Sequence, residues 1–505
     1  MKSFLLACTV LFVLSLSAAA GEIKIPAYYT ALENGLRLLV VPDTNVAVVS
    51  CRLYYFVGSM YESAGFTGLS HMYEHMMFKG TKKLGTRNYA AEVPLMASID
   101  SLDRLLYLHE EVAVESDSIS RAYRKKISLL LDKQRNYIKK DEIWDLYQNN
   151  GATNLNAWTG DDMTAYIVTL PKNKVELFYW IESDRMRNPV LREFTSERDV
   201  VMEERRMRYD NRPLGRYWER LNAIFYVAHP YRNPTIGWAS DIRAFTREKL
   251  EQYINRYYTP DNALIVLVGN IDSLRAKKDV ERYFGAIPRA PRPKEEVVTR
   301  EPAPAGETRF TVYDDAAPHI DMLFHTPGYP DDVLYKMDVI EGIFSGRSGR
   351  LYRRLVDKEG LCTNIGASNN PRLHDSYFQI WADLKNEADP ARVERIVREE
   401  IAKAAAAQPT AVEMRRITNE IRMAFVTDLK SLEGLSDRLA WFERFRSWKD
   451  IMTYPDRIAE VKPGEIPAAV KQYLDPGRMT IGVLLQQPAD TAASRSSEKK
   501  LSPGH

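Results

Sequence analysis

Apolar positions in the first part of the chain predict short strands followed by a helix. Residues 35–56 (GLRLLVVPDTNVAVVSCRLYYF) contain two apolar runs separated by a Pro-Asp-Thr-Asn turn, which is typical of two strands. Over residues 65–79 the apolar spacing changes to three and four, the spacing of a helix. Residues 263–268 form a short apolar run that ends at Gly269 and predicts another strand.

The middle of this region alternates between charged and mixed segments. Residues 97–148 are dense in charge, with apolar residues three and four positions apart, and predict a solvent-exposed helical hairpin. Residues 153–170 are interpreted as one strand with polar punctuation. Residues 181–208 are interpreted as helix with a break at Asn188-Pro189.

A second series of elements follows a proline-rich segment. Residues 287–306 carry five prolines and many charges, so we expect an extended linker rather than a packed element. Beyond it the order repeats, with strands at 309–312 and 320–324, helices at 333–344 and 350–358, and a strand at 377–384. The simplest organisation is an α+β protein of two halves joined by this linker.

The first residues have the pattern of a secretory signal peptide. Lys2 precedes an apolar run over residues 4–16, and Ser17-Ala18-Ala19-Ala20 then predicts cleavage after Ala20. The alternative is an uncleaved membrane anchor, but the apolar run is shorter than the ~20 residues that span a bilayer. No later segment is long and apolar enough to span one, so we expect an exported protein, periplasmic or secreted.

These patterns predict the following domain limits: 1–20 signal peptide, 21–286 N-terminal domain with a helical insertion at about 97–148, 287–306 linker, 307–487 C-terminal domain, and 488–505 disordered tail.

Composition narrows the class of protein. The 505 residues include 70 Lys+Arg and 68 Asp+Glu, a net charge of +2, which argues against a nucleic-acid binder that acts through bulk charge. Cleavage after Ala20 would remove Cys8 and leave Cys51 and Cys362. So few cysteines exclude a disulfide framework, and we expect two buried free thiols rather than a bridge.

The strongest chemical signal is the run His71-Met72-Tyr73-Glu74-His75. On a helix, residues four apart differ by about 40° around the axis, so both imidazoles can reach one metal ion. Glu74 lies on the same edge and can face a water on that metal, an H-x-x-E-H arrangement. The alternative is a surface helix with incidental histidines, but the apolar residues around the motif indicate a buried helix.

Two histidines do not complete a catalytic zinc site, which needs a third protein ligand and an open position for water. Candidates for this carboxylate or histidine lie in residues 197–204. If this segment is helical, Glu197 and Glu204 share a face and Glu203 points elsewhere.

Several further motifs accompany this pair of segments along nearly the whole chain. They are Gly58-Ser59-x-Tyr61-Glu62, Gly68-Leu69-Ser70-His71 through Lys79-Gly80-Thr81, Asn156-Ala157-x-Thr159, Thr164-x-Tyr166, Glu197-Arg198-Asp199-Val200, His229-Pro230-Tyr231 and Tyr258-x-Pro260. With them the sequence resembles the pitrilysin/insulinase family of zinc peptidases, especially the half-length members related to the mitochondrial processing peptidase. The resemblance implies two homologous α/β-sandwich halves.

The resemblance also implies the roles of the candidate residues. His71, His75 and Glu204 would bind one Zn²⁺ per chain, and Glu74 would be the general base of a zinc endopeptidase that takes unfolded peptides. Glu197 would hold a ligand imidazole in place, a role that metal sites usually need. The chain would then be the catalytic subunit.

The resemblance assigns the substrate to one strand. The segment Asn156-Ala157-Trp158 would be the edge that pairs with an extended peptide by β-augmentation. The separation of His75 and Glu204, 204 − 75 = 129 residues, is long for the family, and the helical insertion accounts for the excess.

One departure from the family pattern concerns an Arg and a Tyr, seven residues apart, that complete members place in a later domain closing over the substrate. Val356 and Thr363 occupy these positions here, and Arg353 and Arg354 have the wrong spacing. We therefore expect a partner subunit that supplies the Arg/Tyr pair, which makes the enzyme a two-chain assembly.

Two alternatives remain at the level of sequence. The first is a non-catalytic assembly subunit of the same family that keeps the zinc site. The second is a serine hydrolase built on Gly346-Arg347-Ser348-Gly349, but this run lacks the nucleophile-elbow pattern and favours a loop at the start of a helix. The remaining histidines show no second metal spacing.

Overall fold

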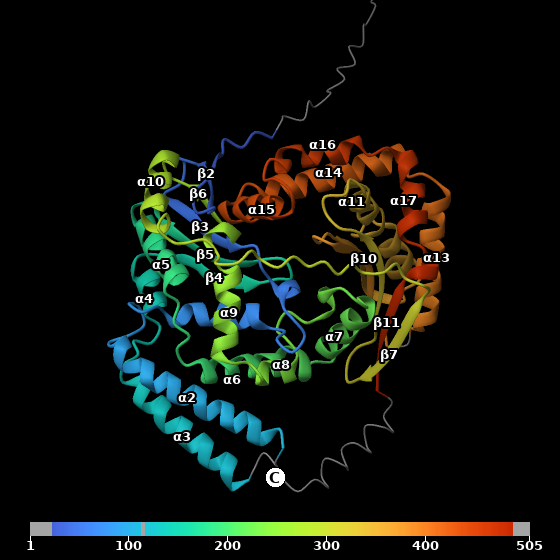
Figure 1. The fold of residues 1–505 in the computed structure, drawn as a ribbon. Helices are drawn as coiled ribbons and strands as arrows, with labels where there is room; N and C mark the ends of the chain where they lie inside the picture. Colours follow the sequence, from blue (N-terminus) through green and yellow to red (C-terminus); the bar gives the residue numbers. More distant parts are fainter. Residues whose placement is uncertain (1–22, 113–116, 387, 488–505) are drawn as a thin grey trace, which may run out of the picture.

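Two β-sheets with helices packed on them make up the protein (Figure 1). The computed structural model describes residues 23–112, 117–386 and 388–487. The predicted signal peptide and the predicted tail lie outside the described residues.

The first sheet has six strands in the order β1-β2-β6-β3-β5-β4. Their bounds are β1 Tyr28–Ala31, β2 Arg37–Pro42, β3 Val48–Tyr55, β4 Thr153–Thr159, β5 Thr164–Pro171 and β6 Ala263–Gly269. β2 and β6 are parallel, and the other neighbours are antiparallel. The two strands expected within 35–56 and the strand expected at 263–268 are confirmed.

The second sheet has five strands in the order β7-β11-β8-β10-β9. Their bounds are β7 Thr308–Asp314, β8 His319–Pro327, β9 Cys362–Asn370, β10 Asp375–Leu384 and β11 Thr480–Gln486. β7 and β11 are parallel and the rest are antiparallel, so this sheet repeats β2-β6-β3-β5-β4 strand for strand. The expected α+β fold of two similar halves is confirmed.

Helices of the first half are α1 Leu69–Met76, α2 Tyr89–Glu110, α3 Ser118–Arg135, α4 Glu142–Asn149, α5 Val175–Arg187, α6 Phe194–Arg205, α7 Pro213–Phe225, α8 Ala239–Arg243, α9 Arg247–Tyr257 and α10 Ser273–Phe284. Those of the second half are α11 Val333–Phe344, α12 Arg350–Tyr352, α13 Pro390–Ala406, α14 Ala411–Asp428, α15 Leu432–Phe445, α16 Asp450–Glu460 and α17 Ile466–Tyr473. Among the described residues, none of these helices is both long and apolar enough to cross a bilayer.

β6 is apolar at every position because both faces of the first sheet are covered. Ala263, Ile265 and Leu267 point into the core formed with the helices of the first half. The alternate residues Leu264 and Val266 point into a second core on the opposite face. All five side chains are fully buried.

Each half supplies a helix to the other half's sheet. α15 of the second half packs on β3 and β6, and its Leu439, Ala440 and Phe442 belong to the second core, the one that contains Leu264 and Val266. Conversely, α7 of the first half lies against β7 and β11 and buries Tyr217 and Leu221 there (Figure 1). Each half therefore has a core of its own, and two further apolar clusters contain residues of both halves.

Some predicted boundaries are wrong. α2 and α3 pack against each other as the expected helical hairpin, but α2 begins eight residues before residue 97, and α4 is a third helix within 97–148. Residues 153–170 form two strands, β4 and β5, because the polar residues between them make a turn. The helix expected at 350–358 has the predicted bounds, but it consists of a short α12 followed by a π-helical turn over Arg353–Lys358.

The prediction for the linker is correct only in part, whereas the prediction for the cysteines is confirmed. Residues 288–306 contain no helix or strand, as expected, but they are packed rather than free, since Glu301 accepts hydrogen bonds from the backbone N–H groups of residues 227–229. Cys51 and Cys362 are buried free thiols, which confirms the prediction.

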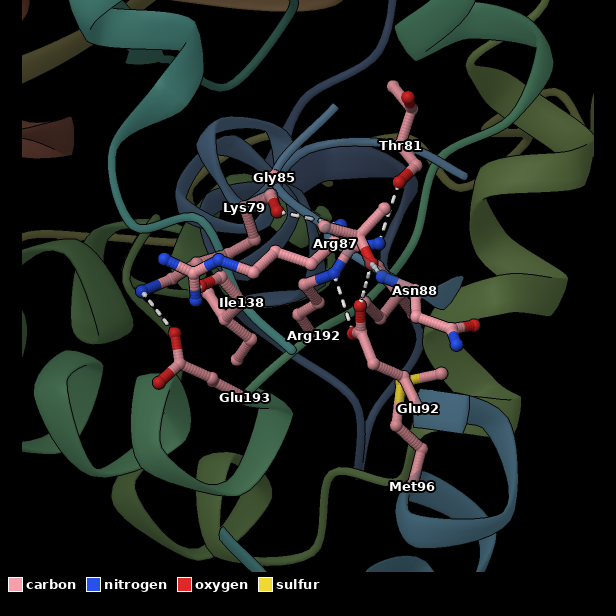
Figure 2. A network of polar contacts seen from close by, with 12 residues as sticks. Lys79, Thr81, Gly85, Arg87, Asn88, Glu92, Met96, Ile138, Arg192 and Glu193 are labelled. Carbon is pink, nitrogen blue, oxygen red and sulfur yellow. Dashed lines mark hydrogen bonds and ion pairs between the residues drawn. The ribbon is translucent and has the colours of Figure 1, made fainter. Parts of the chain in front are cut away.

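A buried arginine fixes the segment that follows α1. Arg192, 1% exposed, lies between α5 and α6 and forms a 2.8 Å ion pair with Glu92 of α2, which is fully buried. Its other N–H groups donate to the backbone oxygens of Lys79, Thr81 and Leu84, at 2.7–3.2 Å. Figure 2 shows the guanidinium between Glu92 and Thr81. One side chain thus joins α2, the segment after α1 and the residues just before α6.

Replacing Arg192 with methionine should lower the free energy of unfolding by about 3–5 kcal/mol, because it leaves the Glu92 carboxylate buried without a partner. Urea denaturation measures this change. The additional change Glu92→Gln should restore part of the loss. Arg135→Ala removes an exposed ion pair with Asp132 and should cost no more than about 1 kcal/mol. Equal losses in the free energy of unfolding for Arg192→Met and Arg135→Ala would contradict the stabilising role of the buried Arg192–Glu92 pair.

A half-buried acidic pair lies on α11, the helix that follows β8 as α1 follows β3. Asp338 accepts hydrogen bonds from Tyr454 (2.8 Å) and from the Asn369 side chain (2.7 Å), and Glu341 accepts one from the Asn369 backbone. Burial raises the pKa of Asp338 to about 6 and that of Glu341 to about 7, while the charge of Arg438 acts against the shift at Asp338.

These raised pKa values predict that stability falls as pH rises. Between about pH 4 and 7 the folded state holds more protons than the unfolded state, so the stability contributed below pH 4 is lost as pH passes the folded pKa values. Asp338→Asn should flatten this slope in urea denaturation at pH 5.0 and pH 7.5. The exposed change Asp132→Asn should keep the wild-type slope, and an unchanged slope in Asp338→Asn would refute the prediction.

Candidate metal centre

The N-terminus of α1 is held by a buried carboxylate from the segment before it. Glu62 accepts hydrogen bonds from the backbone N–H groups of Gly68 (2.6 Å) and Ser70 (2.7 Å), which have no partner within the helix. Burial nevertheless raises the pKa of Glu62 to about 8. α1 packs into the core with Leu69, Met72 and Met76, as the apolar residues around the motif predict.

Two glycines allow a second backbone to approach this helix start. A Cβ atom on Gly68 would lie 2.4 Å from the backbone oxygen of Ile236, and one on Gly237 would lie 2.1 Å from that of Thr67. Both glycines have positive φ, 98° and 92°, which other residues rarely adopt. This contact sets the loop before α8 against the start of α1.

α1 and α6 bring three of the predicted residues together. His71 and His75 come from α1 and Glu204 from α6, and one ligand atom of each lies within 4.8 Å of the others. Glu204 Oε2 is 3.6 Å from His71 Nε2 and 3.2 Å from His75 Nε2. Among the described residues, this is the one group of at least three His, Cys, Asp or Glu that could hold an ion.

Glu197, two helical turns before Glu204 on α6, faces the same cluster. Its Oε1 is 2.9 Å from His75 Nδ1, the ring nitrogen opposite the one that faces Glu204. Its Oε2 forms a 2.6 Å ion pair with Lys79. The expected shared face of Glu197 and Glu204 is therefore observed, and Glu203 instead points outward and pairs with Arg206.

Glu74 lies at the edge of the cluster and is half-buried. Its Oε2 accepts a 2.6 Å hydrogen bond from the Thr159 hydroxyl at the end of β4. Burial raises the pKa of Glu74, while this hydrogen bond and the charge of His75 act against the shift. Thr159 thus fixes the direction of the carboxylate.

The cluster has opposite charges at close range. Burial, together with the charge of His75, lowers the pKa of His71 to about 4. Burial opposes charge on His75, but its contacts with Glu197 and Glu204 raise its pKa to about 9. Burial likewise opposes ionisation of Glu197, yet the hydrogen bonds to His75 and Lys79 lower its pKa to about 2. The pKa of Glu204 is lowered as well, since His75 and His71 outweigh burial.

The donor set fits a divalent zinc ion. Two imidazoles and one carboxylate are a ligand set of catalytic zinc sites, which leave a fourth position open. His75 also has a carboxylate on its other ring nitrogen, the usual support of a metal-binding histidine. Nδ1 of His71 is buried and has no partner within the described residues.

The predicted substrate strand lies at the edge of the first sheet. β4 is paired by β5 on one side, with Asn156 opposite Ile167 and Trp158 opposite Ala165. No strand among the described residues pairs with its other side. Asn156 is exposed, Ala157 is buried and Trp158 is half-buried against Tyr54.

Other residues named from the sequence lie elsewhere. Val356 is partly buried and packs against the core of the second half, and the Thr363 hydroxyl donates to the backbone oxygen of Asp383. Ser348 accepts a hydrogen bond from Arg416 in the turn before α12, which is the expected loop at a helix start. His319 and His325 form hydrogen bonds with aspartates, as structural histidines do.

Three residues of the site were not predicted as such. Thr159 and Lys79 belong to motifs noted in the sequence, but their contacts with Glu74 and Glu197 require the fold. Arg208 forms a 2.9 Å ion pair with Glu204 Oε1. The spacing of four residues between a glutamate and an arginine on a helix could have indicated this pair.

Two family descriptions match the chain. "Insulinase (Peptidase family M16)" matches residues 37–100, which contain the H-x-x-E-H run. "Peptidase M16 inactive domain" matches residues 244–421. Glu197 and Glu204 lie between the two matched ranges.

Similar proteins cover most of the chain. A Helicobacter pylori protein named "Zinc protease PqqE" is 23% identical over 454 residues, which are 88% of this chain and 89% of that protein. The crystal structure of a protease from Helicobacter pylori has a TM-score of 0.77 at 22% identity and covers 91% of this chain and 100% of that chain. The periplasmic protease PqqL from Escherichia coli has a TM-score of 0.69 at 16% identity, covering 96% of this chain and 51% of that chain. These structures share the fold.

Proposed function

Since this chain belongs to the insulinase family of peptidases, M16, we propose that it is a zinc-dependent endopeptidase that hydrolyses peptide bonds of unfolded peptides. The observation that carries the proposal is the convergence of His71, His75 and Glu204 beside Glu74. Relatives named zinc proteases support the same class of activity.

The three converging residues would hold one zinc ion. Zinc, when bound, lowers the pKa of a water towards ~7 and polarises a carbonyl. Glu197 holds the His75 ring by its Nδ1 atom and so directs Nε2 towards Glu204. Lys79 in turn holds Glu197, so the imidazole is oriented by a chain of two contacts.

Glu74 would act as the general base. Its carboxylate takes a proton from the attacking water as the new C–O bond forms, and it delivers that proton to the leaving nitrogen as the C–N bond breaks. The Thr159 hydroxyl occupies Glu74 Oε2 and leaves Oε1 for the water. β4, with Asn156, Ala157 and Trp158, would hold the substrate as an added antiparallel strand next to Thr159.

Export is part of the proposal. It is supported by the signal-peptide pattern of residues 1–20 and by the word periplasmic in the name of the similar Escherichia coli protease. The chain would act in the periplasm or outside the cell.

Glu74→Gln should strongly reduce peptidase activity while one zinc per chain stays bound, because it removes the base and none of the ligands. General acid–base catalysis contributes about 10²–10⁴-fold, which is the expected loss in kcat. The assay uses a quenched peptide mixture and metal analysis of the mature chain. Glu203→Gln, on the outward face of α6, is the matched control and should keep wild-type activity. Full activity in Glu74→Gln would contradict the proposed base.

We further propose that a partner subunit supplies an Arg/Tyr pair, since Val356 and Thr363 stand at the family's positions for it. The zinc-loaded chain alone should then show kcat/KM below about 10⁴ M⁻¹s⁻¹, the lower end for typical enzymes, because transition-state donors are missing. Light scattering at the assay concentration gives the oligomeric state. A fully active monomer would eliminate the partner. A zinc-loaded chain that stays inactive with every partner would support the alternative of a non-catalytic assembly subunit.

A further inference from the structure

The two carboxylate oxygens of Glu204 have different partners. Oε2 faces the Nε2 atoms of His71 and His75. Oε1 forms a 2.9 Å ion pair with Arg208, four residues later in the chain. The carboxylate is therefore divided between the metal cluster on one side and a guanidinium on the other.

Arg208 lies in a π-helical turn, Arg206–Asp210, that follows α6 directly. Such turns are rare and often occur at functional sites. A close backbone contact holds this one, since a Cβ atom on Gly215 at the start of α7 would lie 2.2 Å from the backbone oxygen of Arg208. Arg205, the residue just before the turn, is buried; it donates a hydrogen bond to the backbone oxygen of Gly237 and forms an ion pair with Glu219. The backbone that carries Arg208 is thus fixed on both sides.

The guanidinium stands at the mouth of the cluster. The Arg208 side chain is 66% exposed, whereas that of Glu204 is 14% exposed. Its positive charge acts on His71 and Glu74 as well as on Glu204. It is near the whole cluster but forms its ion pair with Glu204 Oε1 alone among the described residues.

We propose that Arg208 is a positioning residue that restricts Glu204 to a single-oxygen contact with the metal. Because Oε1 is held by the guanidinium, Oε2 is the oxygen left for the ion. The three protein ligands then provide three donor atoms and leave a fourth position for water. Without Arg208, Oε1 is released and both oxygens can bind, which raises the coordination number. This inference rests on the proposed zinc site.

Metal affinity alone does not reveal this role, because two effects oppose each other. Loss of Arg208 removes a cation that repels the metal, which favours binding. It also removes a group that orients a ligand, and such groups typically contribute 10–100-fold to affinity or activity. The number of donor atoms responds to the second effect and not to the first, so coordination is the quantity to measure.

The experiment uses Co²⁺ in place of zinc on the full-length mature chain. Visible d–d absorption of Co²⁺ loses intensity when coordination rises from four to five. The spectra of wild type, Arg208→Ala and Arg208→Lys are compared at one Co²⁺ per chain. Arg206→Ala is the matched control, since Arg206 lies in the same turn, is similarly exposed and pairs with Glu203 on the outward face.

We expect the Co²⁺ bands to weaken in Arg208→Ala, to be restored in Arg208→Lys, and to be unchanged in Arg206→Ala. The kcat/KM of zinc-saturated Arg208→Ala should fall about tenfold. A wild-type spectrum in Arg208→Ala overturns the inference and leaves the proposed function intact. A wild-type chain that binds neither Co²⁺ nor Zn²⁺ overturns the proposed function, and this inference with it.

Discussion

The contact between α6 and α1 is the constraint on which the candidate site depends. α1 alone can place His71 and His75 on one face, but the carboxylate that faces both comes from Glu204, 129 residues after His75. Burying such groups costs free energy unless they are paired. Most polar atoms of the cluster are paired in this way. Glu197 contacts His75 Nδ1, Lys79 pairs with Glu197 Oε2, and Arg208 pairs with Glu204 Oε1.

Long-range contacts hold α6 in this position. Arg198 of α6 forms a bidentate pair with Asp103 of α2, at 2.6 and 2.8 Å, and Arg192, just before α6, donates to the backbone of Lys79 in the segment after α1. Both contacts involve α2 or the segment before it. The helices that lengthen the interval between His75 and Glu204 are therefore part of the support of the site, and α2 is more than an exposed insertion.

The sequence predicts the local part of this arrangement and misses the distant part. His71, Glu74 and His75 follow from helix periodicity, and Glu197 and Glu204 from sharing one face. The contact of Thr159 with Glu74 depends on where β4 ends, and the sequence does not separate β4 from β5 because the polar residues of the turn between them resemble polar positions within one strand. The sequence does not predict β9 and β11. It also does not indicate that α7 and α15 each pack on the sheet of the other half, because the pattern of an amphipathic helix does not identify the surface that the helix covers.

The two halves show that the chemistry resides in side chains rather than in the shared topology. α11 follows β8 and packs on the edge strand β9, as α1 follows β3 and packs on β4. α11 contains no histidine and carries Asp338 and Glu341, which accept hydrogen bonds from Asn369 of β9. A carboxylate on the helix is thus bonded to the edge strand in both halves, Glu74 to Thr159 and Glu341 to Asn369. A helix carboxylate bonded to the edge strand therefore occurs in both halves, whereas the candidate metal centre of the first half also needs the two histidines and α6.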